Sequence, residues 1–274
     1  MYEEFYGLSM RPFGKTPDPA FLFESRQHAE AMARLELAVE ERELALLTGE
    51  IGCGKTLLSR TLVDRLGEEY VPILLVNPRL APGQLLRQVA SRLGVEDVPR
   101  DKSELYEKIS DRLYALDEED KCAVLLIDEA QLVPSKQTFD ELRLLTNFQL
   151  DDRNLLAVVL LAQPEIERRI DRHPAYEPLR QRIGVRFHLG PLSEEEAKKY
   201  IEHRLEVAGA KGSVLSAEAI AAIGRLSGGI PRKINNLAAN TLLEGFGREE
   251  RPIGAAVVED VARELRMKPK DGED

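Results

Sequence analysis

Short apolar runs recur through the first two thirds of the chain, separated by segments with apolar residues at helical spacing. The runs cover residues 44–48, 71–76, 123–127 and 155–161, and a further short strand is predicted at 185–189. A short continuous apolar run is typical of a strand buried on both faces. Strands that alternate with helices predict an α/β fold, a five-stranded parallel sheet with helices on both faces and right-handed crossovers.

The intervening segments predict amphipathic helices. We expect them at residues 25–43, 57–63, 85–93, 103–116, 138–150 and 165–172. From Ser193 the pattern is purely helical, and Ser193 with Glu196 is typical of a helix N-terminus. Four further helices are predicted at residues 194–208, 217–226, 232–245 and 253–265. The sequence therefore predicts an α/β domain over 25–192, a small all-α lid domain over 193–266 and a flexible tail over 267–274.

Residues 1–24 combine aromatic side chains with several prolines. Because proline disfavours a long helix, we expect an extended arm with aromatic anchors. Two roles stay open at this point: the arm packs over the core, or part of it forms a wall around a nucleotide base.

The composition is that of an ordinary soluble protein, with 43% apolar and 31% charged residues among 274. We find no apolar run long enough for a membrane span and no signal-peptide pattern at the N-terminus. The two cysteines, Cys53 and Cys122, indicate no disulfide framework. We therefore expect a cytoplasmic protein, which could reach the inner membrane only through a partner.

Net charge is −10, and acidic residues outnumber basic ones both in 1–192 and in 193–274. Broad nonspecific binding to DNA needs a basic surface, so the net negative charge argues against such binding. A local basic rim is still compatible with a net negative charge.

The segment 49–56, Gly-Glu-Ile-Gly-Cys-Gly-Lys-Thr, lies between the first predicted strand and a helix. Its spacing is that of a phosphate-binding loop, in which glycines let backbone N–H groups point at phosphates. Lys55 supplies a positive charge, and the Thr56 hydroxyl is a ligand for Mg²⁺. ATP with Mg²⁺ is the predicted cofactor. The predicted nucleotide contacts are Gly49, Gly52, Cys53, Gly54, Lys55, Thr56 and Leu57.

Two acids, Asp128 and Glu129, follow the strand at 123–127. Asp128 can hold Mg²⁺ together with Thr56, and Glu129 can orient the attacking water or accept its proton. Polar side chains also follow other strands, at Thr48, Asn77 and Gln163. Because parallel strands end at one edge of a sheet, these groups predict a catalytic cleft there.

The order of these motifs resembles that of AAA+ ATPases. Further segments resemble the ExeA/GspA ATPases of the general (type II) secretion pathway and the similar MSHA-type pilus biogenesis ATPases. These segments are Phe5–Leu8, Pro12-Phe13, Pro17–Pro19, Leu47–Glu50, Leu144–Phe148 and Ala162–Glu165.

The resemblance implies roles for further residues. Asn77 would hydrogen-bond Glu129, and Gln163 would be a sensor that positions water. Arg182 would be a finger entering a neighbouring subunit's site, with Arg180 and Arg186 as rivals, which implies a homo-oligomer. Arg232 would be the sensor of the lid.

The resemblance also implies a function, an ATP-hydrolysing motor or switch in assembly of a secretion or pilus apparatus. The alternative is an ATP-dependent DNA-binding regulator, similar to transposition proteins of the MuB/TniB kind. ExeA is longer, with a membrane segment and a peptidoglycan-binding module. The sequence shows neither, so it gives no basis for inferring anchoring or cell-wall binding. Either a separate partner supplies them, or the chain is a soluble relative with another client.

Overall fold

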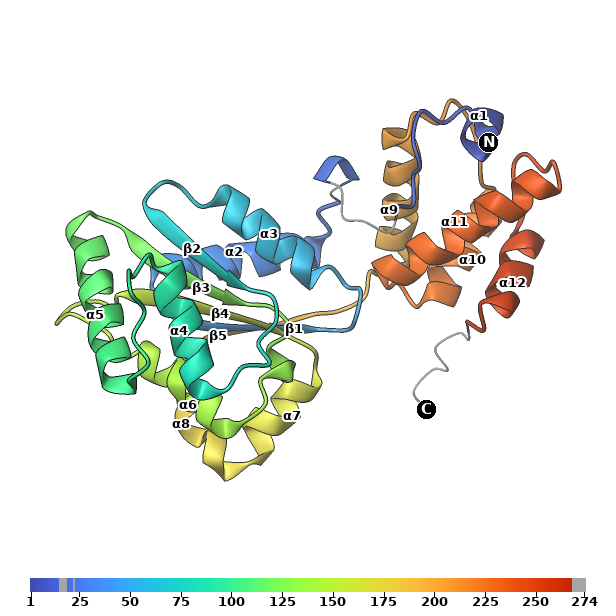
Figure 1. Cartoon of the computed structure of the whole chain (residues 1–274). Helices are drawn as coiled ribbons and strands as arrows, with labels where there is room; N and C mark the ends of the chain where they lie inside the picture. The colour runs from blue at the N-terminus through green and yellow to red at the C-terminus, as the bar shows by residue number, and fades with distance from the viewer. Residues whose placement is uncertain (15–18, 22, 268–274) are drawn as a thin grey trace. The chain divides into compact units, whose positions relative to one another are not determined.

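The computed structural model describes residues 1–14, 19–21 and 23–267 (Figure 1). The chain forms two compact units. One unit combines Met1–Arg26, the short stretch Gly52–Gly54 and the chain from Gly190 onward. The other contains Gln27–Ile51 and Lys55–Leu189. Pro17, Asp18 and nearly all of the predicted tail lie outside the described residues.

The second unit is built on a parallel sheet of five strands in the order β2-β3-β4-β1-β5. The strands are β1 (Leu44–Gly49), β2 (Tyr70–Leu75), β3 (Cys122–Ile127), β4 (Leu156–Ala162) and β5 (Ile183–Leu189). Every residue of β1, β3 and β4 is buried, as expected for strands covered on both faces. The predicted five-stranded parallel sheet is confirmed.

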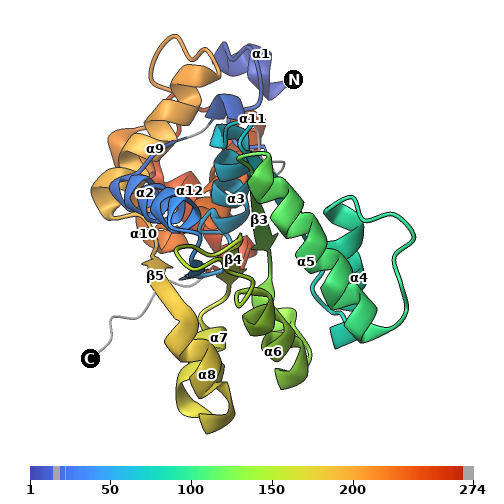
Figure 2. The same ribbon diagram turned by 90° about the vertical axis from the view of Figure 1, so that its left-hand side faces the viewer.

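Helices cover both faces of this sheet (Figures 1 and 2). They are α2 (Arg26–Glu40), α3 (Lys55–Arg65), α4 (Pro82–Arg92), α5 (Lys102–Glu118), α6 (Lys136–Leu145), α7 (Glu165–Arg172) and α8 (Glu177–Arg182). Helices α2 and α3 lie over one face. The main core lies on the other, where α4 to α8 pack against alternate strand residues such as Leu46, Leu125 and Leu160.

Two expectations about this unit are wrong in detail. The run at 71–76 is not a strand buried on both faces, because β2 lies at the sheet edge and pairs only with β3. Within β2 Pro72 is exposed, and Val76, one residue beyond the strand, is 62% exposed. Helix α6 ends at Leu145 rather than near residue 150. The chain reverses there, with Phe148 O accepting from Leu155 N (2.9 Å).

The first unit is mainly helical, with α9 (Glu194–Val207), α10 (Ala217–Ser227), α11 (Pro231–Gly247) and α12 (Ala255–Glu264). The predicted start of α9 is confirmed. The Ser193 hydroxyl accepts from Glu196 N (3.3 Å), and the Glu196 carboxylate accepts from Ser193 N (3.0 Å). Within the described ranges of the chain, no helix combines the length and the apolar character that crossing a bilayer requires.

The N-terminal arm forms part of this helical unit. It is not wholly extended, because α1 (Tyr2–Tyr6) precedes the prolines and ends at Gly7. Phe5 meets Phe246 edge-to-face at 5.4 Å, and Tyr6 is fully buried. Arg204 donates to Pro12 O (2.6 Å) and stacks over Phe21. The arm therefore belongs to the core of the helical unit, the first of its two expected roles.

Candidate nucleotide-binding site

The phosphate-binding loop connects β1 to α3 (Figure 1). Gly52 and Gly54 have φ values of 90° and 106°, a region that only glycine adopts readily. The loop ends where α3 begins at Lys55, so the N-terminus of a helix follows it directly. A glycine loop followed by a helix N-terminus is a general anion-binding arrangement.

Lys55 is held against this loop. Its side chain is only 6% exposed, and Nζ donates to Gly49 O (2.6 Å) and Glu50 O (3.1 Å). The two carbonyl oxygens compensate for burying the ammonium group. The lysine charge is therefore fixed beside the loop, as phosphate binding requires.

The next residue links the loop to the acidic end of β3. Thr56 Oγ1 donates to Asp128 Oδ2 at 2.8 Å, and Asp128 is buried. Asp128 Oδ1 accepts from Glu129 N (2.9 Å). A hydroxyl beside a single carboxylate is the oxygen set with which proteins hold Mg²⁺ next to phosphates. The residues present thus fit a magnesium-bound nucleotide.

Glu129 is held by two amides. It has a left-handed backbone conformation (φ 55°). Its Oε2 accepts from Gln163 Nε2 at 3.1 Å and from Gln131 Nε2. The structure therefore brings Gln163 to the acid, as its position after β4 predicted. Gln131 was missed by the sequence analysis, and its only signal was an amide two residues after Glu129.

Thr48 is fully buried within β1, one residue before the loop. Its hydroxyl donates to Glu167 Oε1 on α7 and lies 3.0 Å from His188 Nδ1 on β5. Because the single hydroxyl proton goes to the carboxylate, His188 Nδ1 must carry the proton of the second contact. Neither Glu167 nor His188 was predicted, since nothing in their spacing relates them to Thr48.

Asn77 does not make its expected contact. Among the described residues Glu129 bonds with the two glutamines and not with Asn77, whose Oδ1 accepts from Arg79 N (3.4 Å). The physical reason is local. β2 ends at Leu75, and Asn77 is exposed in the loop that follows this edge strand.

Arg182 lies at the amino end of β5, whereas the phosphate-binding loop follows the carboxyl end of β1. In the β1–β5 pair, Leu44 lies opposite Ile183 and Gly49 opposite Leu189. Arg182 precedes Ile183, so the length of a strand, about 20 Å, separates it from the phosphate-binding loop. An arginine side chain cannot span that distance.

The three candidate finger arginines differ in their partners. Arg180 pairs with Glu177, whose pKa it lowers, and Arg186 pairs with Asp171 at 3.0 Å. Arg182 donates to neutral acceptors, to Thr146 O (2.7 Å), Thr146 Oγ1 (3.1 Å) and Asn147 Oδ1 (3.1 Å). Among the described residues, no carboxylate pairs with Arg182.

Arg232 is the second residue of α11 and is exposed. It belongs to the same compact unit as Gly52–Gly54, and its N–H donates to Gly52 O at 3.3 Å. A methyl group added to Gly52 would meet Arg232 Cβ at 2.6 Å. The tip of the phosphate-binding loop and the start of α11 are thus in close contact.

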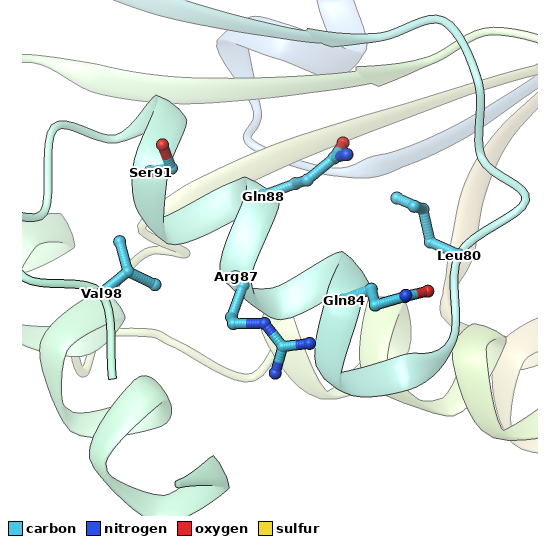
Figure 3. Close-up of a pocket in the computed structure, with 6 residues that line it drawn as sticks. All are labelled: Leu80, Gln84, Arg87, Gln88, Ser91 and Val98. Atoms are coloured by element: carbon cyan, nitrogen blue, oxygen red, sulfur yellow. The ribbon is translucent and has the colours of Figure 1, made fainter. Parts of the chain in front are cut away.

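A separate hollow of 410 Å³ lies along the exposed side of α4 (Figure 3). Its lining is Leu80, Gln84, Arg87, Gln88, Ser91 and Val98. None of these is a predicted site residue. The candidate nucleotide site therefore consists of the phosphate-binding loop and the residues at the strand ends, and does not include this hollow.

Comparison with known proteins agrees with this geometry. Residues 39–170 match the family described as AAA domain. This part of the chain is therefore similar to an AAA domain. The matched region includes the loop, Asp128, Glu129 and Gln163, and the predicted family resemblance is confirmed.

The chain is also 39% identical, over 259 residues, to General secretion pathway protein A of Aeromonas hydrophila. The match includes 92% of this chain but 46% of that protein, so the chain spans about half the length of its curated relative.

Solved structures with the same fold include the Aeropyrum pernix ORC2 protein in ADPNP–ADP complexes, at TM-score 0.69 and 16% identity. Another is the Aeropyrum pernix ORC1 protein in complex with DNA, at TM-score 0.66 and 21% identity. Each match covers 93% of this chain, and 72% and 69% of the respective neighbour. At such identities the likeness establishes the fold alone.

Proposed function

We propose that the chain binds ATP with Mg²⁺ and hydrolyses it, acting as a switch or motor. The observation that carries the proposal is the contact between Thr56 and Asp128, with Glu129 directly beside it. This arrangement combines a metal-binding pair with a candidate base at the end of a phosphate-binding loop.

The residues divide the chemistry among them. Lys55 and the loop amides bind and orient the phosphates, and Thr56 with Asp128 would hold Mg²⁺, which neutralises phosphate charge when bound. Glu129 orients the attacking water and accepts its proton, and Gln163 helps to position that water.

We infer that the working form is a homo-oligomer. Arg182 lies a strand length from its own loop and has no carboxylate partner among the described residues, so it serves a site in the next subunit. Arg232 contributes from the helical unit, and its contact with Gly52 makes it responsive to the occupied loop.

The biological role that we propose is assembly of a secretion apparatus, with ATP consumed on the cytoplasmic side. The support is the similarity to General secretion pathway protein A. The partner would be a component of that apparatus.

The test is steady-state ATP hydrolysis together with nucleotide affinity. Lys55→Ala should abolish binding, whereas Glu129→Gln should bind ATP and hydrolyse it at least about 100-fold more slowly. Lys199→Ala, an exposed lysine on α9, is the matched control and should behave as wild type. Retained affinity in Lys55→Ala would remove the loop from the site, and normal turnover in Glu129→Gln would remove the base.

The role in secretion is tested separately, by ATP-dependent co-purification of Glu129→Gln with components of the secretion apparatus. Retention on DNA at low salt, without such components, would instead favour the DNA-binding regulator.

A further inference from the structure

We propose that Gln131 is a positioning residue that holds the Glu129 carboxylate in place and ties it to the end of β4. The inference rests on the proposed hydrolysis, in which Glu129 is the base. Gln131 lies in the short turn Ala130–Leu132 that follows the acidic pair.

Both ends of the Gln131 amide are used, and their partners fix its orientation. Oε1 accepts from Gln163 N at 3.0 Å, and Nε2 donates to Glu129 Oε2. Since a backbone N–H can only donate and a carboxylate can only accept, the reversed amide would lose both bonds. Gln131 is therefore a two-ended bridge.

The bridge determines which carboxylate oxygen of Glu129 is available. Oε2 accepts from two side-chain amides, Gln131 and Gln163. Within the described residues, Oε1 has no such hydrogen bond. The backbone of Glu129 is also fixed, because its N–H donates to Asp128 Oδ1. Oε1 is thus the oxygen left to face a water molecule.

The same bridge couples two segments. Gln163 follows β4 and contributes both its backbone N–H and its side-chain amide to the cluster. A shift at the end of β4 would therefore move Gln131 and Glu129 together. The expected hydrogen bond between Asn77 and Glu129 is absent among the described residues. Gln131 makes a side-chain hydrogen bond to Glu129 instead.

Two variants separate positioning from packing. Gln131→Met keeps the length of the side chain and removes both hydrogen bonds. Gln131→Glu keeps an acceptor for Gln163 N but places a second carboxylate against Glu129, which favours protonation of one of them. We expect kcat to fall about 10–100-fold in Gln131→Met and further in Gln131→Glu, with ATP affinity unchanged.

The deciding experiment is a double-mutant cycle in kcat between Gln131→Met and Glu129→Gln. If Gln131 acts through Glu129, Gln131→Met has no further effect in the Glu129→Gln background. Gln88→Ala, a glutamine on the exposed side of α4, is the control and should leave kcat unchanged.

If kcat is lower than wild type in Glu129→Gln but equal to wild type in Gln131→Met, the inference is overturned and the proposed function remains intact. Additive effects would also overturn it, as would a loss explained by lower ATP affinity or thermal stability. Absence of hydrolysis in the wild-type protein would instead contradict the proposed function.

Discussion

The buried hydroxyl of Thr48 provides a sharp test of the network beside the phosphate-binding loop. Replacing Thr48 by Val keeps the shape of the side chain and substitutes a methyl group for Oγ1. The variant loses the hydrogen bond to Glu167 Oε1 and the contact with His188 Nδ1. Both partners keep some access to water, which can replace part of the loss.

The expected cost follows from these contacts. A hydrogen bond to a charged group contributes about 1.5–3 kcal/mol, and partial replacement by water places this one near the lower end. A loss of about 1.5–2 kcal/mol should lower Tm by about 3–8 °C, at about 2–4 °C per kcal/mol for a domain of this size.

The measurement is differential scanning calorimetry of Thr48→Val, Glu167→Ala and the double variant. If the hydroxyl stabilises the fold through Glu167, the double variant should be less destabilised than the sum of the single variants by at least about 1 kcal/mol. Additivity within about 0.5 kcal/mol would refute the reasoning and assign the loss to packing around the new methyl group.

Two further predictions concern other parts of the molecule. Arg182→Ala should bind ATP normally yet lose hydrolysis, and mixing it with Glu129→Gln should restore activity, because a mixed assembly contains sites with an intact base and an intact arginine; no recovery in mixtures that assemble would contradict a finger acting between subunits. Hydrogen bonds from Arg153 and then Arg42 lower the pKa of Asp117, so this carboxylate stabilises the fold above its unfolded pKa of about 3.9 and loses that effect as pH falls through its folded value. The Tm difference between wild type and Asp117→Asn should therefore be constant from about pH 7 to 5 and shrink below about pH 4, and a gap independent of pH would show that charge is not its origin.

The parts of the fold that sequence could predict are those written in local patterns. Continuous apolar runs identify β3 and β4, whose burial on both faces follows from their central place. The same kind of run gave a wrong environment for β2, because no short window tells whether a strand ends up at the edge of a sheet. Likewise, prolines at 12 and 17 do not prevent the short helix α1 that precedes them.

The candidate site divides in a similar way. Gly52, Lys55 and Asp128 belong to motifs whose spacing carries the chemistry, so they could be found without coordinates. Gln131 and Glu167 depend on how a turn and a helix orient single side chains toward the strand ends. Such contacts between residues distant in sequence have no periodic signal, and Asn77 shows the converse, since a polar residue after a strand does not by itself reach the acid.

The joint origin of the helical unit from both ends of the chain has a consequence for synthesis on the ribosome. Phe5 and Tyr6 emerge long before Phe246 and Glu250, which they contact. At about 5–20 residues per second, Gln27–Leu189 alone takes roughly 8–30 s to be made. The sheet-containing unit, Gln27–Ile51 and Lys55–Leu189, is then complete while Phe5 and Tyr6 still lack their partners. A nascent chain stalled before residue 190 should therefore expose Phe5 and Tyr6 to chaperones, and synthesis beyond residue 250 should allow them to be buried.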